Sequence, residues 1–283
     1  MRLLLSLAVL FLAAACIPAP AIVPTDTAAP LPLTASPSAE TPAPSPSLAP
    51  TPVPAPTLAP AGFWQPLFPG AEVLTTGDGL TAIRHLAAGV RYSHRFEPDP
   101  GQGRGVGGWL SADGQARAAI NCGFYLQEDA GYRHIGLLMT NGEGPTRLRS
   151  RWGGVLIVRD GAAFVVRNPQ RLLAPATLGL QGWPMLVEAR AVIPGLNDED
   201  NDRRTAAGVD GQGRVVWVAD ARGRTLADFA HRLLRPDLGL VDAVNLDGGS
   251  STGLRWRWTP VSPANGPESL PVPCALLLTP LEP

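Results

Sequence analysis

Residues 17–61 limit most strongly what this chain can fold into, because they consist almost entirely of proline, alanine, threonine and serine. Such a segment cannot bury enough apolar surface to offset the entropy of ordering it, so we predict a disordered linker. Proline-rich chains favour extended polyproline II at roughly 3.1 Å per residue, which gives this linker a reach on the order of 100 Å. A ligand for a proline-binding module is the alternative, but a clear basic PxxP motif is missing.

The N-terminus has the pattern of an export signal. Arg2 supplies a positive charge, and Leu3–Leu12 form an apolar segment that is too short for a comfortable membrane span. The run LAAAC, which ends at Cys16, resembles a bacterial lipoprotein box, in which the cysteine becomes the lipidated first residue. Ala13 departs from this pattern, since leucine is the usual residue there. A plain secretory peptide cleaved nearby is the alternative.

These segments predict how the chain is organised: a signal peptide at 1–15, a disordered linker at 16–61 and a folded part at 62–283. The folded part has a length that suits a single domain. We expect the protein outside the cytoplasm, either attached to a bacterial membrane through a lipid on Cys16 or secreted.

Charge and residue usage exclude several functions. The formal net charge is −1, so no long-range field favours binding to nucleic acid. All 23 basic residues are arginine, and the absence of lysine excludes a Schiff-base mechanism and a lysine general base.

Two cysteines, Cys122 and Cys274, remain beyond Cys16. Two cysteines in an exported domain are typical of one disulfide. It would close a loop of about 150 residues and stabilise the fold by on the order of 4 kcal/mol in the chain-entropy model. Two buried free thiols are the alternative.

Short β-type runs dominate the folded part. Asp160-Gly161 between two such runs is a strong signal for a two-residue hairpin. The expected strands lie in the runs at 80–86, 90–96, 116–125, 155–159, 162–166, 208–220 and 275–279.

One helix is clear, at Thr225–Pro236. Thr225 and Asp228 form a start resembling a capping box, apolar residues then recur at helical spacing, and Pro236 ends the pattern. A strand at Leu238–Leu246 follows. Strand, helix and strand in this order predict one crossover unit within a mostly β sheet.

The segment Val241–Leu254, VDAVNLDGGSSTGL, is the main candidate for chemistry. An apolar run ends on Asp247, and Gly248 and Gly249 allow positive φ or a close approach to a ligand. Hydroxyls and free N–H groups beyond them could hold an anion. An ordinary strand-to-loop turn, with Asp247 bonded to its own backbone, explains this segment equally well.

Two other motifs fail on inspection. Asp198, Asp200 and Asp202 suggest a calcium loop, but Arg203 and Val209 stand where that loop requires glycine and glutamate. A solvated acidic loop is therefore the expectation.

The run Gly249–Gly253 fits G-x-S-x-G, with Ser251 as the nucleophile of a serine hydrolase. That motif needs a helix after the serine and a later histidine. The sequence after it is not helical, and all four histidines come earlier, so we reject this function.

Arg203 and Arg204 follow the acidic run. A guanidinium suits a phosphate because its planar fork donates two hydrogen bonds at once. An ion pair with the adjacent acids is the alternative, and we expect it for Arg203. Asn121 ends another strand before glycine and is either a turn residue or a ligand amide.

Several other residues carry weaker signals. Nothing in their surroundings distinguishes the following from surface residues: His134, Glu143, Glu188 and Asp220. Most of the 7 tryptophans are expected in the core, with one or two available to stack on a sugar ring.

Three segments together resemble the phosphodiester glycosidase family. They are INCGFY from Ile120, RRTAAGVDGQGRVVWVAD from Arg203, and TLADFAHRLLRPDLGLVDAVNLDGGSSTGL from Thr225. The resemblance extends from about Leu80 to Leu278 and is strongest after Arg203. It implies an α+β domain with a mixed, largely antiparallel β-sheet and a few packed helices, and hydrolysis of a sugar joined through its anomeric oxygen to a phosphodiester.

The resemblance also implies functional positions. Arg204 would hold the phosphate, assisted by N–H groups around Gly248–Ser250, and Asp247 would stabilise an oxocarbenium-like transition state or activate water. Two asparagines would bind sugar hydroxyls or orient Asp247. The family motif sites are Asn121, Arg204, Thr205, Asn245, Asp247, Gly248 and Gly249.

This chain departs from the family pattern in places. Cys122 replaces a usual glycine, and Cys274 replaces a common asparagine, which supports a disulfide between them. QGWPMLVE resembles a glycine-proline element, with Trp183 inserted and Glu188 where aspartate-glycine is commoner. Glu188 and Asp220 are candidates for a second carboxylate.

The predicted function is therefore hydrolysis of a sugar phosphodiester at the cell envelope. No cofactor is firmly implied, and metal dependence is left open. The expected partners are a carbohydrate phosphodiester or cell-wall glycan and, through the lipid, a membrane. A non-catalytic, lipid-anchored binder of cell-wall glycan is the alternative, since the linker and tryptophans suit it equally well.

Overall fold

A computed structural model describes residues 62–167, 169 and 176–281 of the chain. The signal peptide, Cys16 and the linker lie outside these residues, so their predictions are not tested. Within the described residues, no helix is long and apolar enough to cross a membrane.

The largest unit is an eight-stranded sheet in the order β1-β2-β3-β16-β15-β17-β13-β14. Apolar residues alternate along its central strands, so that each face buries its own cluster. Its strands are β1 (Gln65–Phe68), β2 (Ala71–Thr75), β3 (Leu80–His85), β13 (Met185–Glu188), β14 (Ala191–Val192), β15 (Asp202–Asp210), β16 (Val215–Arg224) and β17 (Leu240–Asn245).

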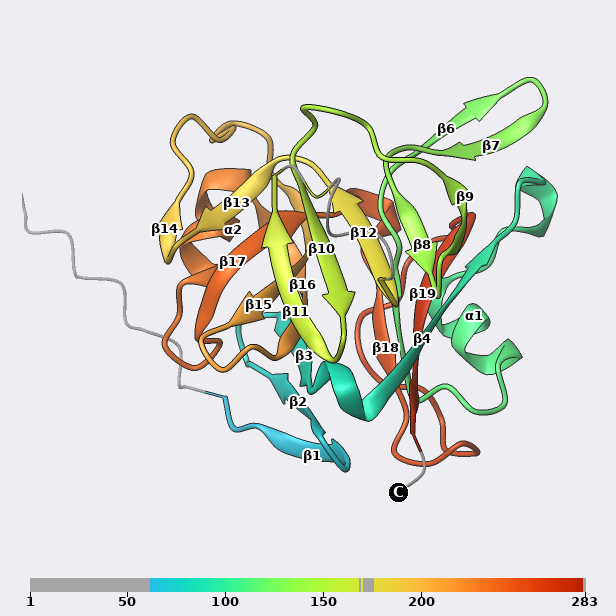
Figure 1. Cartoon of the computed structure of the whole chain (residues 1–283), viewed down its shortest axis with the longest axis horizontal. Coiled ribbons are helices and arrows are strands. Elements are labelled where there is room, and N and C mark those ends of the chain that lie inside the picture. Colours follow the sequence, from blue (N-terminus) through green and yellow to red (C-terminus); the bar gives the residue numbers. More distant parts are fainter. Residues whose placement is uncertain (1–61, 168, 170–175, 282–283) are drawn as a thin grey trace, which may run out of the picture. The chain divides into compact units, whose positions relative to one another are not determined.

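A four-stranded sheet in the order β18-β5-β19-β4 faces the large one, and a five-stranded sheet in the order β11-β10-β12-β8-β9 adjoins both (Figure 1). The four-stranded sheet contains β4 (Val90–Phe96), β5 (Ala118–Asn121), β18 (Leu254–Trp256) and β19 (Cys274–Pro280). The five-stranded sheet contains β8 (Leu138–Thr140), β9 (Glu143–Thr146), β10 (Gly154–Arg159), β11 (Ala162–Val166) and β12 (Leu178–Gly182). A separate hairpin consists of β6 (Tyr125–Glu128) and β7 (Gly131–His134).

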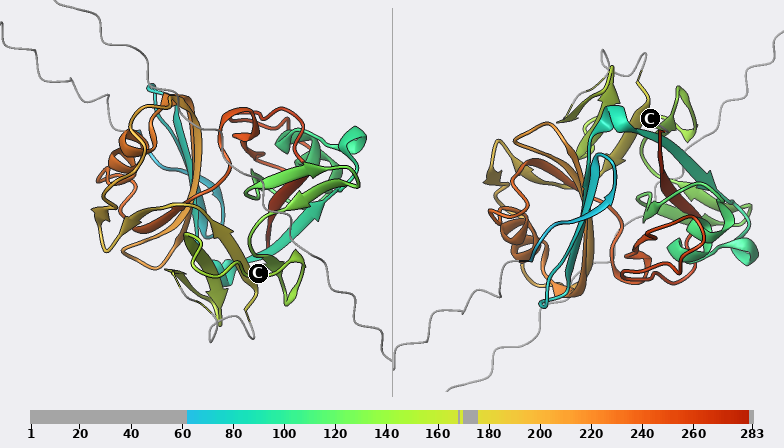
Figure 2. Two further views of the ribbon diagram at one scale, coloured as in Figure 1. Left: turned by 90° about the horizontal axis from the view of Figure 1, so that it is seen from above. Right: turned by 90° about the horizontal axis from the view of Figure 1, so that it is seen from below.

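Helix α2 (Leu226–Leu233) covers the outer face of the large sheet (Figure 2). Its stripe of Phe229, Ala230 and Leu233 is fully buried there. The Thr225 hydroxyl accepts a hydrogen bond from the Asp228 N–H at 3.0 Å, which satisfies one of the free donors at the helix start. The helix therefore begins as the sequence predicted.

The crossover unit is also confirmed. Strands β16 and β17 both pair antiparallel with β15, so they are parallel to each other, and α2 connects them over β15. The Asp160-Gly161 hairpin between β10 and β11 is confirmed as well, with positive φ at both turn residues.

Two parts of the fold differ from the expectation. Every strand pairing among the described residues is antiparallel, so the sheet is not mixed, although the predicted antiparallel character is confirmed. The described residues are β-rich, with two α-helices, and approximate the predicted α+β class.

The second helix, α1 (Val106–Ala112), packs on the outer face of the four-stranded sheet and was not predicted. Its glycines disfavour a helix in isolation. The side chains of Glu268 and Ser269 accept hydrogen bonds from the N–H groups of Gly107 and Val106, at 2.9 and 3.0 Å. Tertiary contacts therefore form this helix. The part of the chain that the structure describes also contains three short 3-10 turns: Ala87–Gly89, Pro100–Gln102 and η3 (Gly249–Ser251).

Candidate active site

The segment after β17 connects the two facing sheets. The Leu246 N–H still donates to the Thr205 carbonyl of β15, at 2.8 Å, so the large sheet extends one residue beyond β17. Asp247, Gly248 and η3 then cross to β18, which pairs with β5 in the four-stranded sheet. We call residues 246–253 the crossing loop. It places Asp247 at the junction of the two sheets.

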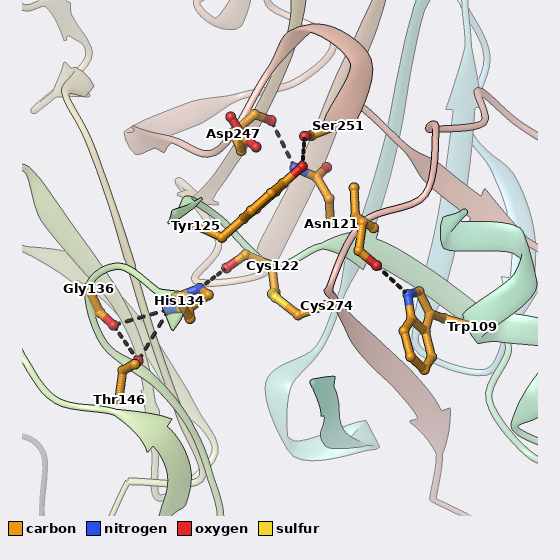
Figure 3. The surroundings of a disulfide bond; sticks show 11 residues. Trp109, Asn121, Cys122, Tyr125, His134, Gly136, Thr146, Asp247, Ser251 and Cys274 are labelled. Carbon is orange, nitrogen blue, oxygen red and sulfur yellow. Dashed lines mark hydrogen bonds between the residues drawn. A yellow bond between two sulfur atoms is a disulfide. The ribbon is translucent and has the colours of Figure 1, made fainter. Parts of the chain in front are cut away.

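Asn121, at the end of β5, fixes both ends of the crossing loop. Its Nδ2 donates to the Asp247 carbonyl at 2.8 Å (Figure 3). Its Oδ1 accepts from the Gly253 N–H at 3.4 Å. The Asn121 N–H donates to the Gly253 carbonyl at 3.2 Å. Since its Nδ2 and Oδ1 both bond to the backbone of the loop, Asn121 positions the loop.

Arg204 lies directly beside this loop on β15. The position that a Cβ would take on Gly248 is 3.8 Å from the Arg204 Cδ. The Arg204 Nε donates to the Arg224 carbonyl at 2.8 Å, and its Nη2 donates to the Asp200 carbonyl. The guanidinium is therefore held by two backbone carbonyls, one just before β15 and one at the end of β16. Burial lowers its pKa, and the nearby Asp202 and Asp200 oppose this effect.

Gly248 and Gly249 of the loop are required by close approaches and by backbone conformation. A Cβ on Gly248 would lie 2.7 Å from the Arg203 carbonyl oxygen. Gly249 has φ +59°, and a Cβ there would lie 2.8 Å from the Asp202 Oδ2. A side chain at Gly248 would push the loop away from β15, and one at Gly249 would be strained by the positive φ. The glycine pair thus keeps Asp247 and Arg204 in neighbouring segments.

Burial raises the pKa of Asp247 above its ordinary value. Hydrogen bonds from the Ser251 hydroxyl and the Gly248 N–H act in the opposite direction, and the charge of Asp202 adds to the rise. The Gly248 N–H lies 3.0 Å from the Asp247 Oδ1, which is the backbone turn contact considered from the sequence. Strongly influenced carboxylates of this kind concentrate at functional sites.

Three other predicted positions lie in or beside the crossing loop. Thr205 is fully buried, and its Oγ1 has no partner among the described residues. Asn245 donates its Nδ2 to the Trp183 carbonyl at 2.8 Å, and within the same described ranges its buried Oδ1 has no partner. Ser250 is exposed, and its carbonyl accepts from the Leu270 N–H at 2.9 Å.

The Cys122–Cys274 disulfide is present, with the two Cα atoms 5.7 Å apart. It joins the end of β5 to the start of β19, one residue beyond Asn121. His134 lies beside it, and the two sulfurs and a His134 nitrogen form a group that could hold a metal. This group does not fit a metal here, because both sulfurs are in the disulfide. The His134 ring nitrogens face the Cys122 carbonyl, the Gly136 carbonyl and Thr146 (Figure 3).

The weaker candidates lie elsewhere or have structural contacts. Glu188 is exposed and pairs with Arg167 at 2.9 Å, and its neighbours in the sheet lie toward the start of β17, away from Asp247. Asp220 is fully buried and is not a surface residue. It lies 2.9 Å from Arg232 Nε on α2, and its Oδ1 accepts from the Arg222 N–H at 3.0 Å. His134 is also buried.

The remaining expectations are met in part. Arg203 donates to the Glu268 carbonyl at 3.1 Å, in place of the expected ion pair with an adjacent acid. Among the tryptophans, three are buried, so the expectation that most lie in the core is wrong. The buried ones are Trp109, Trp217 and Trp256.

Sequence reasoning missed the contacts of three residues around the segment that carries Asp247. Ser251 was considered only as a nucleophile, yet hydrogen bonding by its side chain lowers the pKa of Asp247. Tyr125 comes from the β6–β7 hairpin and contacts Ser251. Trp183 is 50% exposed, and its N–H donates to the Asn245 carbonyl at 2.9 Å. The inserted Trp183 was visible in the sequence, but its position beside Asn245 was not.

Taken together, these contacts define a class: an antiparallel β-sheet domain with a polar site where its sheets meet, built around a carboxylate, a strand-end guanidinium and a glycine loop. A family model for phosphodiester glycosidases matches residues 114–279. The chain therefore belongs to the phosphodiester glycosidase family.

Solved structures support the same fold. A hypothetical protein from Synechocystis aligns with TM-score 0.51 and 16% identity, covering 79% of this chain and 64% of its own, so this chain spans less than two thirds of that protein. The catalytic domain of zebrafish N-acetylglucosamine-1-phosphodiester α-N-acetylglucosaminidase, auto-inhibited by its pro-peptide, aligns with TM-score 0.51 and 16% identity over 75% of this chain and 78% of its own. A Burkholderia pseudomallei protein described as exported aligns with TM-score 0.51 and 15% identity over 74% of both chains. No curated protein matches the sequence.

Proposed function

We propose that this protein hydrolyses a sugar-1-phosphodiester at the cell envelope. The observation that carries the proposal is the close packing of the crossing loop on β15, which brings the Asp247 carboxylate and the Arg204 side chain into neighbouring segments. The zebrafish structure that shares the fold bears a name describing an N-acetylglucosamine-1-phosphodiester substrate. We extend that substrate class to this chain.

Asp247 is the proposed key carboxylate. A phosphodiester is already a good leaving group, so strong acid catalysis matters less here than for an ordinary glycoside. Charge stabilisation and positioning matter more. Asp247 would stabilise the oxocarbenium-like transition state or activate the attacking water. Its hydrogen bonds with Gly248 and Ser251 favour the charged form that either role needs.

Arg204 is the proposed phosphate-binding residue. A guanidinium has about five N–H donors, and the carbonyls of Arg224 and Asp200 occupy only part of them. The same two contacts hold the planar group still, so little entropy is lost when it binds an anion. N–H groups of Gly249 and Ser250 would assist, whereas that of Gly248 already donates to Asp247.

The remaining polar groups have supporting roles. Asn121 orients the loop that carries Asp247, because its amide contacts both ends of that loop. Asn245 and Thr205 have free buried oxygens among the described residues and are candidates for sugar hydroxyls. Trp183 is an exposed tryptophan whose carbonyl accepts a hydrogen bond from Asn245. We assign its ring to stacking on the sugar.

The envelope location rests on the N-terminal sequence alone. The apolar segment Leu3–Leu12, the LAAAC run at Cys16 and the proline-rich linker support a lipid-tethered domain outside the cytoplasm. The expected partners are a carbohydrate phosphodiester or cell-wall glycan, and a membrane through the N-terminal lipid.

The test of the proposal is a substrate panel with the purified protein. An N-acetylglucosamine-1-phosphodiester with a methyl leaving group should release free sugar, with and without chelator to settle metal dependence. Arg204→Ala should raise KM for the phosphodiester by about tenfold, since hydrogen bonds to a charged group contribute ~1.5 kcal/mol or more. KM for an uncharged aryl glycoside should change less.

Arg203→Ala is the matched control, because this neighbouring arginine donates to the Glu268 carbonyl and is not assigned to the phosphate. It should leave both KM values near those of the unmodified protein. Equal effects of Arg204→Ala on the two substrates would remove Arg204 from the phosphate site. Tight binding of glycan without any release of sugar would favour the non-catalytic binder.

A further inference from the structure

A tyrosine from a separate hairpin contacts the loop that carries Asp247. The Tyr125 hydroxyl lies 3.4 Å from the Ser251 Oγ (Figure 3). Hydrogen bonding by Ser251 is in turn one of the influences that lower the pKa of the Asp247 carboxyl. Tyr125 in β6 and Ser251 in η3 thus connect the hairpin to the segment that carries Asp247, two residues beyond β17. Ser251 is buried, and Tyr125 is half-buried.

The direction of the hydrogen bonds follows from the number of protons. A serine hydroxyl has a single hydrogen to donate. If Ser251 donates it to the Asp247 carboxylate, then its Oγ can only accept from Tyr125, which must be the donor. The 3.4 Å separation is longer than usual, as is common for catalytic contacts before a substrate binds.

The position of Tyr125 is fixed by the base of the β6–β7 hairpin. Its ring packs edge-on against Tyr132, with the ring centroids 5.1 Å apart. The Tyr132 N–H donates to the Pro98 carbonyl at 2.6 Å, which ties the hairpin to the rest of the protein. The Tyr125 hydroxyl is therefore presented to the crossing loop by packing that does not depend on that hydroxyl.

Other charged groups surround Asp247, and each has a separate effect. From β15, the Asp202 charge raises the pKa of Asp247. The next two residues of that strand, Arg203 and Arg204, have side chains that donate to backbone carbonyls. Beyond the loop, the Glu268 carboxylate accepts from the Gly107 N–H. Ser251 and the Gly248 N–H are the groups that favour the charged form of Asp247 by hydrogen bonding.

We propose that Tyr125, acting through Ser251, is a positioning residue that orients the Asp247 carboxylate and keeps it ionised for the reaction. This proposal rests on the proposed function in one respect, the role of Asp247 as the key carboxylate. The proposal gives the β6–β7 hairpin a function in the site, although the hairpin is far from Asp247 in the sequence. Tyr125 itself touches no reacting atom in this scheme.

The first test is the pH dependence of kcat/KM for a sugar-1-phosphodiester. Tyr125→Phe removes only the hydroxyl and keeps the ring packing on Tyr132. It should move the acidic limb of the profile to higher pH, because the charged form of Asp247 loses support. Ser251→Ala should move the limb further in the same direction and lower kcat/KM by about tenfold.

The double variant decides whether the two residues act in series. Adding Tyr125→Phe to Ser251→Ala should produce no additional shift, since the tyrosine acts only through the serine. Tyr132→Phe is the matched control, because it removes a hydroxyl from the same hairpin that takes no part in this line of contacts. An unshifted limb in Tyr125→Phe, or an equal shift in Tyr132→Phe, would overturn the proposal.

A second measurement does not depend on activity. Carboxyl NMR of protein labelled with 13C-aspartate, assigned with Asp247→Asn, reports the titration of Asp247 directly. Its midpoint should rise in Tyr125→Phe and in Ser251→Ala, and an unchanged midpoint in both would contradict the proposal. Failure of the proposed function is distinguishable, since Asp247→Asn would then keep full activity while the NMR midpoints still shifted.

Discussion

The carboxyl group of Asp247 has a proposed chemical role, and its burial disfavours the charged form. Burial raises the pKa of its carboxyl, which means that the folded protein disfavours the charged form. Hydrogen bonds from Gly248 and Ser251 lower the pKa of Asp247, but less than burial raises it. A carboxylate held in this way is characteristic of a functional site, since an ordinary turn residue would be better placed in solvent.

The first prediction at the residue scale concerns pH and stability. Because the folded pKa of Asp247 is raised, the folded state binds more protons than the unfolded state between the two pKa values. Stability attributable to this group is therefore present below the unfolded pKa and is lost as pH rises through the folded pKa.

Asp247→Asn cannot ionise and should escape this loss. Its melting temperature should equal or exceed that of the unmodified protein at pH 7, and this difference should disappear at acidic pH. Its turnover of sugar phosphodiester should fall by at least about 100-fold. Thermal denaturation across pH and an activity assay check both parts. Lower stability at pH 7 than at acidic pH, relative to the unmodified protein, would show that Asp247 has a structural role instead.

Helix α2 and its flanking strands show how an element supports the site from a distance. The helix connects β16 to β17 across β15, so it sets the path of the strand that delivers Asp247. Its apolar stripe buries Phe229 and Leu233 against the large sheet. Its first turn depends on the Thr225 hydroxyl.

Thr225→Ala should therefore destabilise the protein by about 1 kcal/mol, the usual cost of losing an N-cap side chain. Urea denaturation would measure the change. Thr225→Ser keeps the hydroxyl and should restore most of the stability. Equal destabilisation by both variants would indicate that the threonine methyl group, and not the cap, supports the helix.

The disulfide is the second feature at this scale that stabilises the fold around the site. It joins β5 to β19 across 152 residues, directly after Asn121. Replacing both Cys122 and Cys274 with serine should lower the free energy of unfolding by about 4 kcal/mol, because the unfolded chain regains the entropy of an open loop. Denaturation with and without reductant should show that reduction affects only the unmodified protein. Insensitivity of the unmodified protein to complete reduction would contradict this prediction.

At the scale of the whole molecule, the candidate site lies where three sheets meet. The end of β12 leads through Trp183 to Asn245, β5 supplies Asn121, and β15 supplies Arg204. The crossing loop contacts β5 and β15, and Asn245, directly before the loop, bonds to Trp183 after β12. No single segment contains the site, so its formation requires the complete arrangement of sheets around the shared core.

The prediction at this scale concerns attachment to a membrane. Radiolabelled fatty acid should be incorporated into the full chain expressed in a bacterium with lipoprotein processing, and Cys16→Ser should abolish the label. The physical reason is that the cysteine after the apolar segment is the only acceptor expected for the lipid. Cys122→Ser is a control that should keep the label. Unlabelled protein in the medium would favour a plain secretory signal.

The sequence alone determined the local features of this protein. The crossover helix, the Asp160-Gly161 hairpin and most strand positions follow from apolar spacing, capping and turn residues, which act over a few neighbouring positions. Asp247 and Arg204 could be proposed for the same reason, since each stands at the end of a strand with an informative neighbourhood.

The tertiary structure decided everything that depends on distant segments. Helix α1 forms around glycines because Glu268 and Ser269 satisfy its N-terminal donors. Tyr125 meets Ser251 only because the hairpin and the crossing loop are brought together by separate sheets. Contacts of this kind depend on long-range packing, whose free energy is shared across the core and leaves no pattern in adjacent residues.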